Sequence, residues 1–341
     1  MIQNNNTIIK QKCPTKLKHL DFSSILLSIA IIVVMILILV APTTYAKSVL
    51  KGLSIFFKSV LPGLLPFMFL CKLLTKLNCM NFFTKFLEKP ANKLFGVNSN
   101  GISAFLLSML SGYPLGARIT SDLYSQNQIS KTNATKTAIL SSTPGAIYVI
   151  GAVGGSMLNN TKLGLVIYIS CTCSTLITSI IFNLIFKTQT QQQNLNKEIK
   201  QKEKNIVVSS VQETVIGLLT VAFYISMFSL TIDLLTNLKV ISLLSYPLCL
   251  IFGKNANFAI NGLISGLIEM TNGAKLLSSI KSSPIIISLI ASVISFSGLS
   301  IIMQSFNFLS NTSINKIQFI IAKIIQAIIS FFICFLICRI I

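Results

Sequence analysis

Long apolar runs alternate with short polar, mostly basic segments along the whole chain. The apolar runs cover residues 25–41, 49–74, 101–118, 134–158, 163–186, 211–235, 240–252, 258–268, 284–306 and 317–341. An α-helix needs ~20 apolar residues to cross a bilayer. The pattern therefore predicts an all-α polytopic membrane protein with seven spanning helices. The segment 101–125 and its counterpart in the second half are predicted to be re-entrant, entering and leaving on one side.

Composition and charge support the same class of protein. Of the 341 residues, 52% are hydrophobic and 11% are charged, which excludes a soluble enzyme, a disordered chain and a disulfide scaffold. The 28 Lys and Arg outnumber the 8 Asp and Glu and lie in clusters between apolar runs, as expected for cytoplasmic loops. We therefore expect a lipid bilayer around the protein, a cytoplasmic N-terminus and no nucleic-acid partner.

Residue types that carry catalysis or bind metals are scarce. The chain has one His and eight Cys, and the Cys are scattered through apolar segments. The pairs Cys171/Cys173 and Cys334/Cys338 could be metal or disulfide pairs, but carboxylates near them are lacking. Hydrolase, zinc-protease and nucleotide-binding motifs are missing. We expect no enzymatic activity, no catalytic residue, no metal and no cofactor.

The two halves of the chain contain matching short segments at one offset of 157 residues. The matches pair Phe95-Gly96 with Phe252-Gly253, Asn98 and Asn100 with Asn255 and Asn257, and Gly116-Ala117-Arg118 with Gly273-Ala274-Lys275. We predict an N-terminal segment with the first transmembrane helix (1–47), a first repeat (48–186), a basic cytoplasmic linker (187–206) and a second repeat (207–341). Three crossings in each repeat would invert one relative to the other, and inverted repeats of transporters bind substrate at their interrupted helices.

The first candidate site is the segment 111–118, Ser-Gly-Tyr-Pro-Leu-Gly-Ala-Arg. Gly112, Pro114 and Gly116 interrupt a helix, and a broken helix at membrane depth is tolerated where it lines a cavity. Arg118 adds a planar cation that suits a carboxylate. A cytoplasmic turn with a snorkelling Arg118 is the alternative.

The second candidate site begins at Glu269, which directly follows the apolar run 260–268. An acid inside the membrane is costly and indicates function. Thr271, Asn272 and Gly273 add a hydroxyl, an amide and flexible backbone. The alternative is a structural ion pair between Glu269 and Lys275 or Arg118.

Two hydroxyl-rich interruptions, at 141–145 and 295–300, form the third candidate site. Such interruptions restart a helix and point N–H donors at a ligand, which suits an anion. Helix packing through Ser and Thr is the alternative. Together, the predicted substrate-binding residues are Ser111, Gly112, Tyr113, Pro114, Gly116, Arg118, Thr143, Pro144, Gly145, Glu269, Thr271, Asn272, Gly273, Lys275, Ser297, Gly298, Ser300 and Gln304.

Several of these segments carry a resemblance to a known family. The chain resembles the YlbJ/SpoVV sporulation integral membrane proteins from about residue 48 onward, and Ser297-Gly298 stands where that family often has Gly-Gly. The resemblance rests on LPGLLPF (61–67), KLFGV (93–97), SGYPLGAR (111–118), STPGAIYVIGAVG (142–154), GLIEMTNG (266–273) and SFSGLSIIMQ (295–304). It implies a nucleoside-recognition Gate domain, similar to the inverted-repeat fold of concentrative nucleoside transporters. It also implies movement of dipicolinic acid across the outer forespore membrane.

Three functions stay open at this point. The first is a sporulation transporter for a small organic dianion, located in the cell membrane or the outer forespore membrane. The second is a nucleoside or ion-coupled transporter of the same fold, and the third is a non-transporting protein of spore-envelope assembly. The interrupted helices favour the two transporters, because a scaffold has no need of polar backbone at membrane depth. A homo-oligomer stays open as well.

Overall fold

The computed structural model describes residues 22–77, 84–186 and 205–340, and every regular element in them is helical. The chain divides into two units, Met1–Ala46 and Lys47–Ile341. In the first unit, α1 (Phe22–Val40) is a helix without a charged residue, and α2 (Pro42–Ile55) begins there and continues into the second unit. The predicted all-α membrane protein is confirmed at this level.

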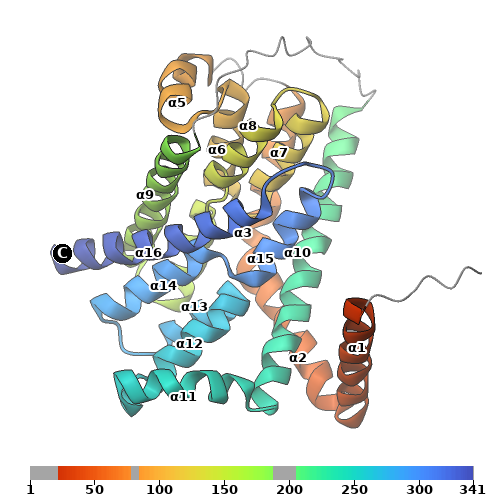
Figure 1. The fold of residues 1–341 in the computed structure, drawn as a ribbon, viewed down its shortest axis with the longest axis vertical. Coiled ribbons are helices and arrows are strands. Elements are labelled where there is room, and N and C mark those ends of the chain that lie inside the picture. The colour runs from red at the N-terminus through yellow and green to blue at the C-terminus, as the bar shows by residue number, and fades with distance from the viewer. Residues whose placement is uncertain (1–21, 78–83, 187–204, 341) are drawn as a thin grey trace, which may run out of the picture. The chain divides into compact units, whose positions relative to one another are not determined.

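The first half of the second unit begins with one long helix and ends with another (Figure 1). The π-helical turn η1 joins α2 to α3, so that helix runs unbroken over Pro42–Lys76. α6 and α7 form a hairpin, and α8 and η3 are two parts of one interrupted helix. The bounds are η1 (Phe56–Val60), α3 (Leu61–Lys76), η2 (Lys85–Leu87), α5 (Glu88–Phe95), α6 (Ser99–Ser111), α7 (Leu115–Ser125), α8 (Lys131–Leu140), η3 (Ile147–Met157) and α9 (Thr161–Ile185).

The second half repeats this order of elements. A long helix and a short one are followed by the hairpin α12–α13, the interrupted helix α14–α15 and a final helix of 25 residues, the same length as α9. The bounds are α10 (Ile206–Asn237), α11 (Val240–Phe252), η4 (Lys254–Ala256), α12 (Asn257–Ile268), α13 (Met270–Ser278), α14 (Pro284–Phe296), α15 (Gly298–Phe308) and α16 (Lys316–Ile340). The duplication, the inversion and the likeness to nucleoside transporters stay predictions.

Five of the described helices are long and apolar enough to cross a membrane, and a sixth span is reached if a pair bent by 93° is counted as one. The sequence predicted seven. The run 134–158 is not one helix, because residues 142–145 are non-helical and separate α8 from η3. The run 25–41 also falls outside the five, which are Pro42–Lys76, Thr161–Ile185, Ile206–Asn237, Pro284–Phe308 and Lys316–Ile340.

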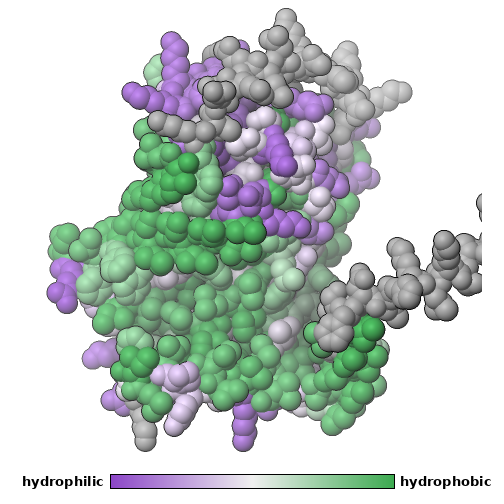
Figure 2. Space-filling view, viewed as in Figure 1, coloured by the Kyte–Doolittle hydropathy of each residue, from purple (hydrophilic) through white to green (hydrophobic). Residues whose placement is uncertain are grey.

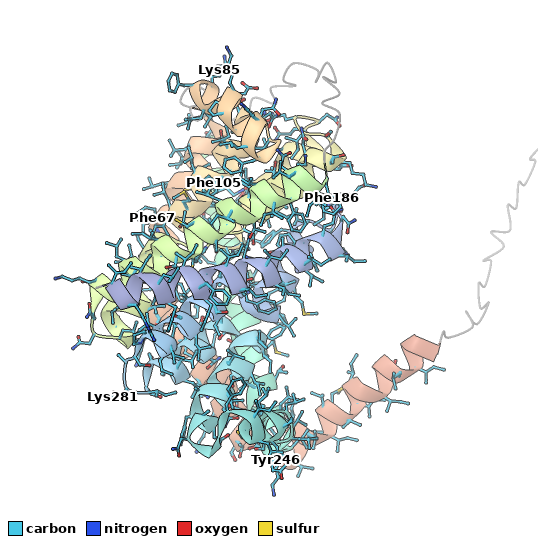
Figure 3. The ribbon with its side chains drawn as sticks, turned by 60° about the vertical axis from the view of Figure 1, so that its left-hand side comes forward. Phe67, Lys85, Phe105, Phe186, Tyr246 and Lys281 are labelled. Atoms are coloured by element: carbon cyan, nitrogen blue, oxygen red, sulfur yellow. The ribbon has the colours of Figure 1, made fainter. Side chains whose placement is uncertain are left out.

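Figure 2 shows one face of the second unit, on which apolar side chains cover α12, α14 and α16. Polar side chains gather around α5 and α7. Lys85 and Tyr246 lie toward opposite ends of this unit, with Phe67 and Phe105 between them (Figure 3). An apolar band bounded by polar ends is the surface that a bilayer requires. The predicted cytoplasmic linker, by contrast, lies almost wholly outside the described residues.

Candidate functional site

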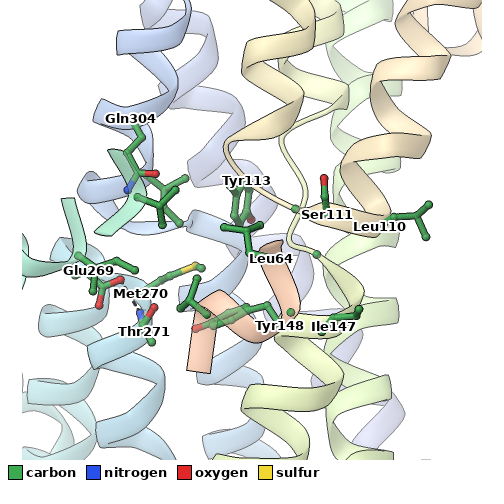
Figure 4. A pocket seen from close by; sticks show the side chains of 17 residues that line it. Leu64, Leu110, Ser111, Tyr113, Ile147, Tyr148, Glu269, Met270, Thr271 and Gln304 are labelled. Atoms are coloured by element: carbon green, nitrogen blue, oxygen red, sulfur yellow. Dashed lines mark hydrogen bonds between the residues drawn. The ribbon is translucent and has the colours of Figure 1, made fainter. Parts of the chain in front are cut away.

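A cavity of about 50 Å³ lies where the two hairpins meet the interrupted helices (Figure 4). Water needs ~10–15 Å³ of such space, so the cavity has room for a few molecules. Apolar side chains of α3, α6, α10 and α15 form part of its wall. Its polar wall consists of Ser111, Tyr113, Tyr148, Glu269, Thr271 and Gln304.

The starts of three helices line this cavity. Gly112 and Tyr113 precede α7, Gly145 precedes η3, and Glu269 precedes α13. The first N–H groups of a helix have no partner within the helix and carry a partial positive charge. No side chain caps α7 or η3, and none caps the neighbouring α15, whose Gln304 also lines the cavity. This arrangement can attract an anion.

Glu269 occupies the start of α13 with its own carboxylate. The side chain is 1% exposed and accepts hydrogen bonds from the backbone N–H groups of Thr271 (3.0 Å) and Asn272 (2.7 Å) and from Asn272 Nδ2 (3.0 Å). Asn272 Nδ2 also donates to Ser229 Oγ on α10 at 2.9 Å. Glu269 is therefore held rigidly at the cavity wall by donors that favour its charged form.

Neither cation considered as a partner of Glu269 is paired with it. Lys275 is exposed on α13, and Arg118 pairs with Glu213 instead, donating to Glu213 Oε2 and to the Glu213 backbone oxygen at 3.1 Å each. A buried carboxylate that pairs with no cation in the described part of the chain is a costly arrangement, which indicates a ligand or a transported proton.

Two buried polar atoms at the cavity, Tyr148 Oη and Gln304 Oε1, have no hydrogen-bond partner among the residues that the structure describes. Gln304 is 1% exposed, and its amide nitrogen reaches Ser300 Oγ only at 3.5 Å. An unpaired buried polar group costs free energy, so such groups are rare unless a water or a ligand satisfies them. Both side chains are thus suited to contact a substrate, although Tyr148 did not belong to the predicted set.

Close backbone contacts hold the interruptions together. A Cβ atom on Gly112 would lie 2.8 Å from Gly145 Cα, so the first hairpin contacts the first interrupted helix without intervening side chains. A Cβ atom on Gly298 would lie 3.0 Å from Met270 N, which gives the second half the same kind of contact. Tyr113 joins the two halves, because its hydroxyl donates to Ile294 O of α14 at 2.9 Å.

The structure brings most of the eighteen predicted residues to this region. Seven line the cavity: Ser111, Gly112, Tyr113, Gly145, Glu269, Thr271 and Gln304. Nine are buried in the packing around the interruptions: Pro114, Gly116, Thr143, Pro144, Asn272, Gly273, Ser297, Gly298 and Ser300. Arg118 and Lys275 lie outside the cavity wall, and the role of all eighteen in substrate binding stays a prediction.

Arg118 belongs to a cluster of charges that joins α3, α7 and α10. Lys72 is 2% exposed and contacts Glu213 at 2.9 Å and Asp122 at 3.3 Å, while Lys76 contacts Glu213 at 2.8 Å. Glu213 thus faces three cations. The cluster holds the second arm of the first hairpin against the two long helices, so Arg118 has a structural ion pair, with Glu213 as its partner and not Glu269.

Lys323, like Tyr148, is a residue that the sequence reasoning missed. It is 1% exposed in the first half of α16, and its ammonium lies 4.6 Å from the centre of the Tyr113 ring, beside the cavity. Nζ donates to the backbone oxygens of Ser142 and Ser295, one at each interrupted helix. A lysine within an apolar run of 25 residues was the available signal, because intramembrane cations indicate function.

Comparison with known proteins identifies a related sporulation membrane protein. Over 304 residues the chain is 28% identical to the sporulation integral membrane protein YlbJ of Bacillus subtilis (strain 168), which covers 81% of this chain and 73% of that protein. No protein-family profile and no solved structure matches the chain. The chain is a multi-pass integral membrane protein related over most of its length to YlbJ, and this relationship supports its membership of the YlbJ family of sporulation membrane proteins.

Proposed function

We propose that the protein is a secondary transporter or facilitator whose substrate site is the cavity between the hairpins and the interrupted helices. The observation that carries this proposal is the convergence of uncapped helix starts on a cavity that also holds two unpartnered polar atoms. Non-helical backbone at membrane depth is tolerated where it lines a cavity or meets a ligand. A scaffold for spore-envelope assembly has no use for such a site.

The proposed substrate is a small organic dianion, and the resemblance to the YlbJ/SpoVV family specifies dipicolinic acid crossing the outer forespore membrane. Dipicolinate is a flat ring with two carboxylates. Helix starts and the Tyr148 hydroxyl supply donors for a carboxylate, and Leu64 and Ile301 supply an apolar surface for the ring. The cavity holds only a few waters, so we propose that the hairpins move apart to admit the substrate.

Glu269 favours a second candidate of the same kind, a nucleoside or ion-coupled transporter. Its carboxylate lines the cavity and pairs with neither Arg118 nor Lys275. A negative charge there would repel a dianion unless a coupled proton or cation neutralises it. The same carboxylate could accept hydrogen bonds from ribose hydroxyls, or it could carry a proton or a cation together with the substrate.

Uptake into vesicles that contain the purified protein separates these candidates. We expect labelled dipicolinate to enter faster than into protein-free vesicles, and excess unlabelled dipicolinate to compete while uridine does not. Uptake of uridine with no effect of dipicolinate would establish the nucleoside transporter instead. Uptake of neither compound by correctly folded protein would favour the assembly protein.

A further inference from the structure

The ammonium group of Lys323 sits among oxygen atoms at the ends of both interrupted helices. Nζ donates to Ser142 O at 2.9 Å, two residues beyond the end of α8, and to Ser295 O at 3.1 Å, in the last turn of α14. The third contact is Gln326 Oε1 at 2.9 Å. The carbonyl end of a helix carries a partial negative charge and favours a cation.

The three contacts require the charged form of the lysine. An ammonium group has three N–H donors and no acceptor, and all three partners are oxygen atoms that accept. The orientation of the Gln326 amide is supported by its nitrogen, which lies 3.4 Å from Ile139 O of α8. Lys323 makes no ion pair with a carboxylate in the described part of the chain. Its charge is therefore balanced by helix ends and by the face of the Tyr113 ring.

We infer that Ser142 O, Ser295 O and Gln326 Oε1 form a site for a monovalent cation, and that the ammonium of Lys323 fills this site permanently. Each interrupted helix presents its carbonyl end to the same cation, so one charge joins the two halves of the protein. In other transporters, unwound carbonyls and helix C-terminal ends bind a dissociable ion. Here the ion is attached to α16 by its own side chain.

A consequence follows for transport, and it rests on the proposed function. Because a tethered ammonium already occupies the oxygens, no Na⁺ is needed at this place to hold the interrupted helices together. Any dependence of uptake on Na⁺ is therefore expected to come from the Glu269 carboxylate and not from these oxygens. A dependence on Na⁺ that persists in the residual uptake of Glu269→Gln would contradict this part of the inference.

The cation site itself is tested without transport, through the melting temperature of the purified full chain. Lys323→Ala removes the ammonium together with three carbon atoms, and n-propylammonium has the size and charge of the missing part. We expect Lys323→Ala to melt several degrees lower, and n-propylammonium to raise its melting temperature in a saturable way. Lys323→Met fills the space without charge and should gain nothing from the amine. Lys316→Ala, at an exposed position of the same helix, is the matched control.

The same variants extend the test to uptake. Lys323→Ala should lose ~10-fold or more in initial rate, because each charge-assisted hydrogen bond is worth about that factor, and n-propylammonium should restore part of it. If Lys323→Ala is recovered only from cells supplied with the amine, the inference is supported as well.

Other outcomes overturn the inference. If Lys323→Ala or Lys323→Met melts at the same temperature as the unmodified protein, the ammonium does not stabilise the structure. If Lys323→Ala is destabilised and the amine does not raise its melting temperature, the oxygens are not a cation site. The same conclusion follows if Lys323→Ala protein cannot be recovered with or without the amine while Lys323→Met protein is recovered normally. If the unmodified protein transports nothing, the proposed function fails, but the melting temperatures still decide about the cation site.

Discussion

Replacing Glu269 by Gln is expected to lower dipicolinate uptake by ~10- to 100-fold, because charge-assisted hydrogen bonds worth ~1.5–3 kcal/mol are lost. Three donors point at the Glu269 carboxylate, namely the backbone N–H groups of Thr271 and Asn272 and the side chain of Asn272. A glutamine has one acceptor oxygen and brings an NH₂ group that faces a donor. The variant also loses the charge that a coupled proton or cation would need.

The double variant Glu269→Gln with Lys275→Met decides whether the carboxylate acts through that lysine. Because Lys275 is exposed, we expect the double variant to remain as inactive as Glu269→Gln alone. The measurement is the initial rate of uptake, with the melting temperature of each protein as the control for folding. Restored uptake in the double variant would show that Glu269 acts as a structural ion pair with Lys275. Full uptake in Glu269→Gln alone would show that Glu269 acts neither as that ion pair nor as a contact for substrate or a coupling ion.

The second large effect is expected at Gly112, where the first hairpin contacts the first interrupted helix. Gly112 has φ +79° and ψ −168°, a region that is essentially restricted to glycine and costs other residues ~1–3 kcal/mol. In Gly112→Ala the new Cβ would also lie 2.8 Å from Gly145 Cα, which adds an overpacking cost of ~1–3 kcal/mol. We expect a clearly less stable protein with little uptake.

Gly253 provides a matched control for this prediction. Its φ of +86° and ψ of 157° lie in the same region, but a Cβ atom there would have no neighbour within 4 Å. Gly253→Ala should therefore carry the backbone cost alone and keep its uptake. Thermal unfolding and uptake of both variants are the measurements. Equal losses of stability in the two variants would show that the Gly112–Gly145 contact contributes nothing.

Much of the helical architecture could be predicted from the sequence, because long apolar runs and helix-breaking residues have local causes. Gly112, Gly145 and Gly298 lie at three interruptions, and Glu269 lies at the fourth. The predicted count of seven spans was not reached. Hydropathy alone could not show that residues 142–145 leave the helix and separate α8 from η3.

The partners of the charged residues could not be predicted, because they lie far apart along the chain. Arg118 pairs with Glu213, 95 residues away, so this cation holds two helices together, while its role toward a substrate stays a prediction. Lys323 reaches Ser142 across 181 residues. Sequence reasoning that searched for interrupted segments passed over it, because α16 itself is an unbroken helix.

Protection of a cysteine in the cavity shows whether dipicolinate binds there. Ser111 lines the cavity and Lys275 is exposed outside it, so Ser111→Cys and Lys275→Cys are compared in separate proteins. Alkylation at each position is followed by peptide-resolved mass spectrometry, which distinguishes it from reaction at the native cysteines. We expect dipicolinate, but not uridine, to slow alkylation at position 111 in a saturable way and to leave position 275 unchanged. Unchanged alkylation at position 111, at dipicolinate concentrations that saturate uptake, would place the substrate elsewhere and contradict the account.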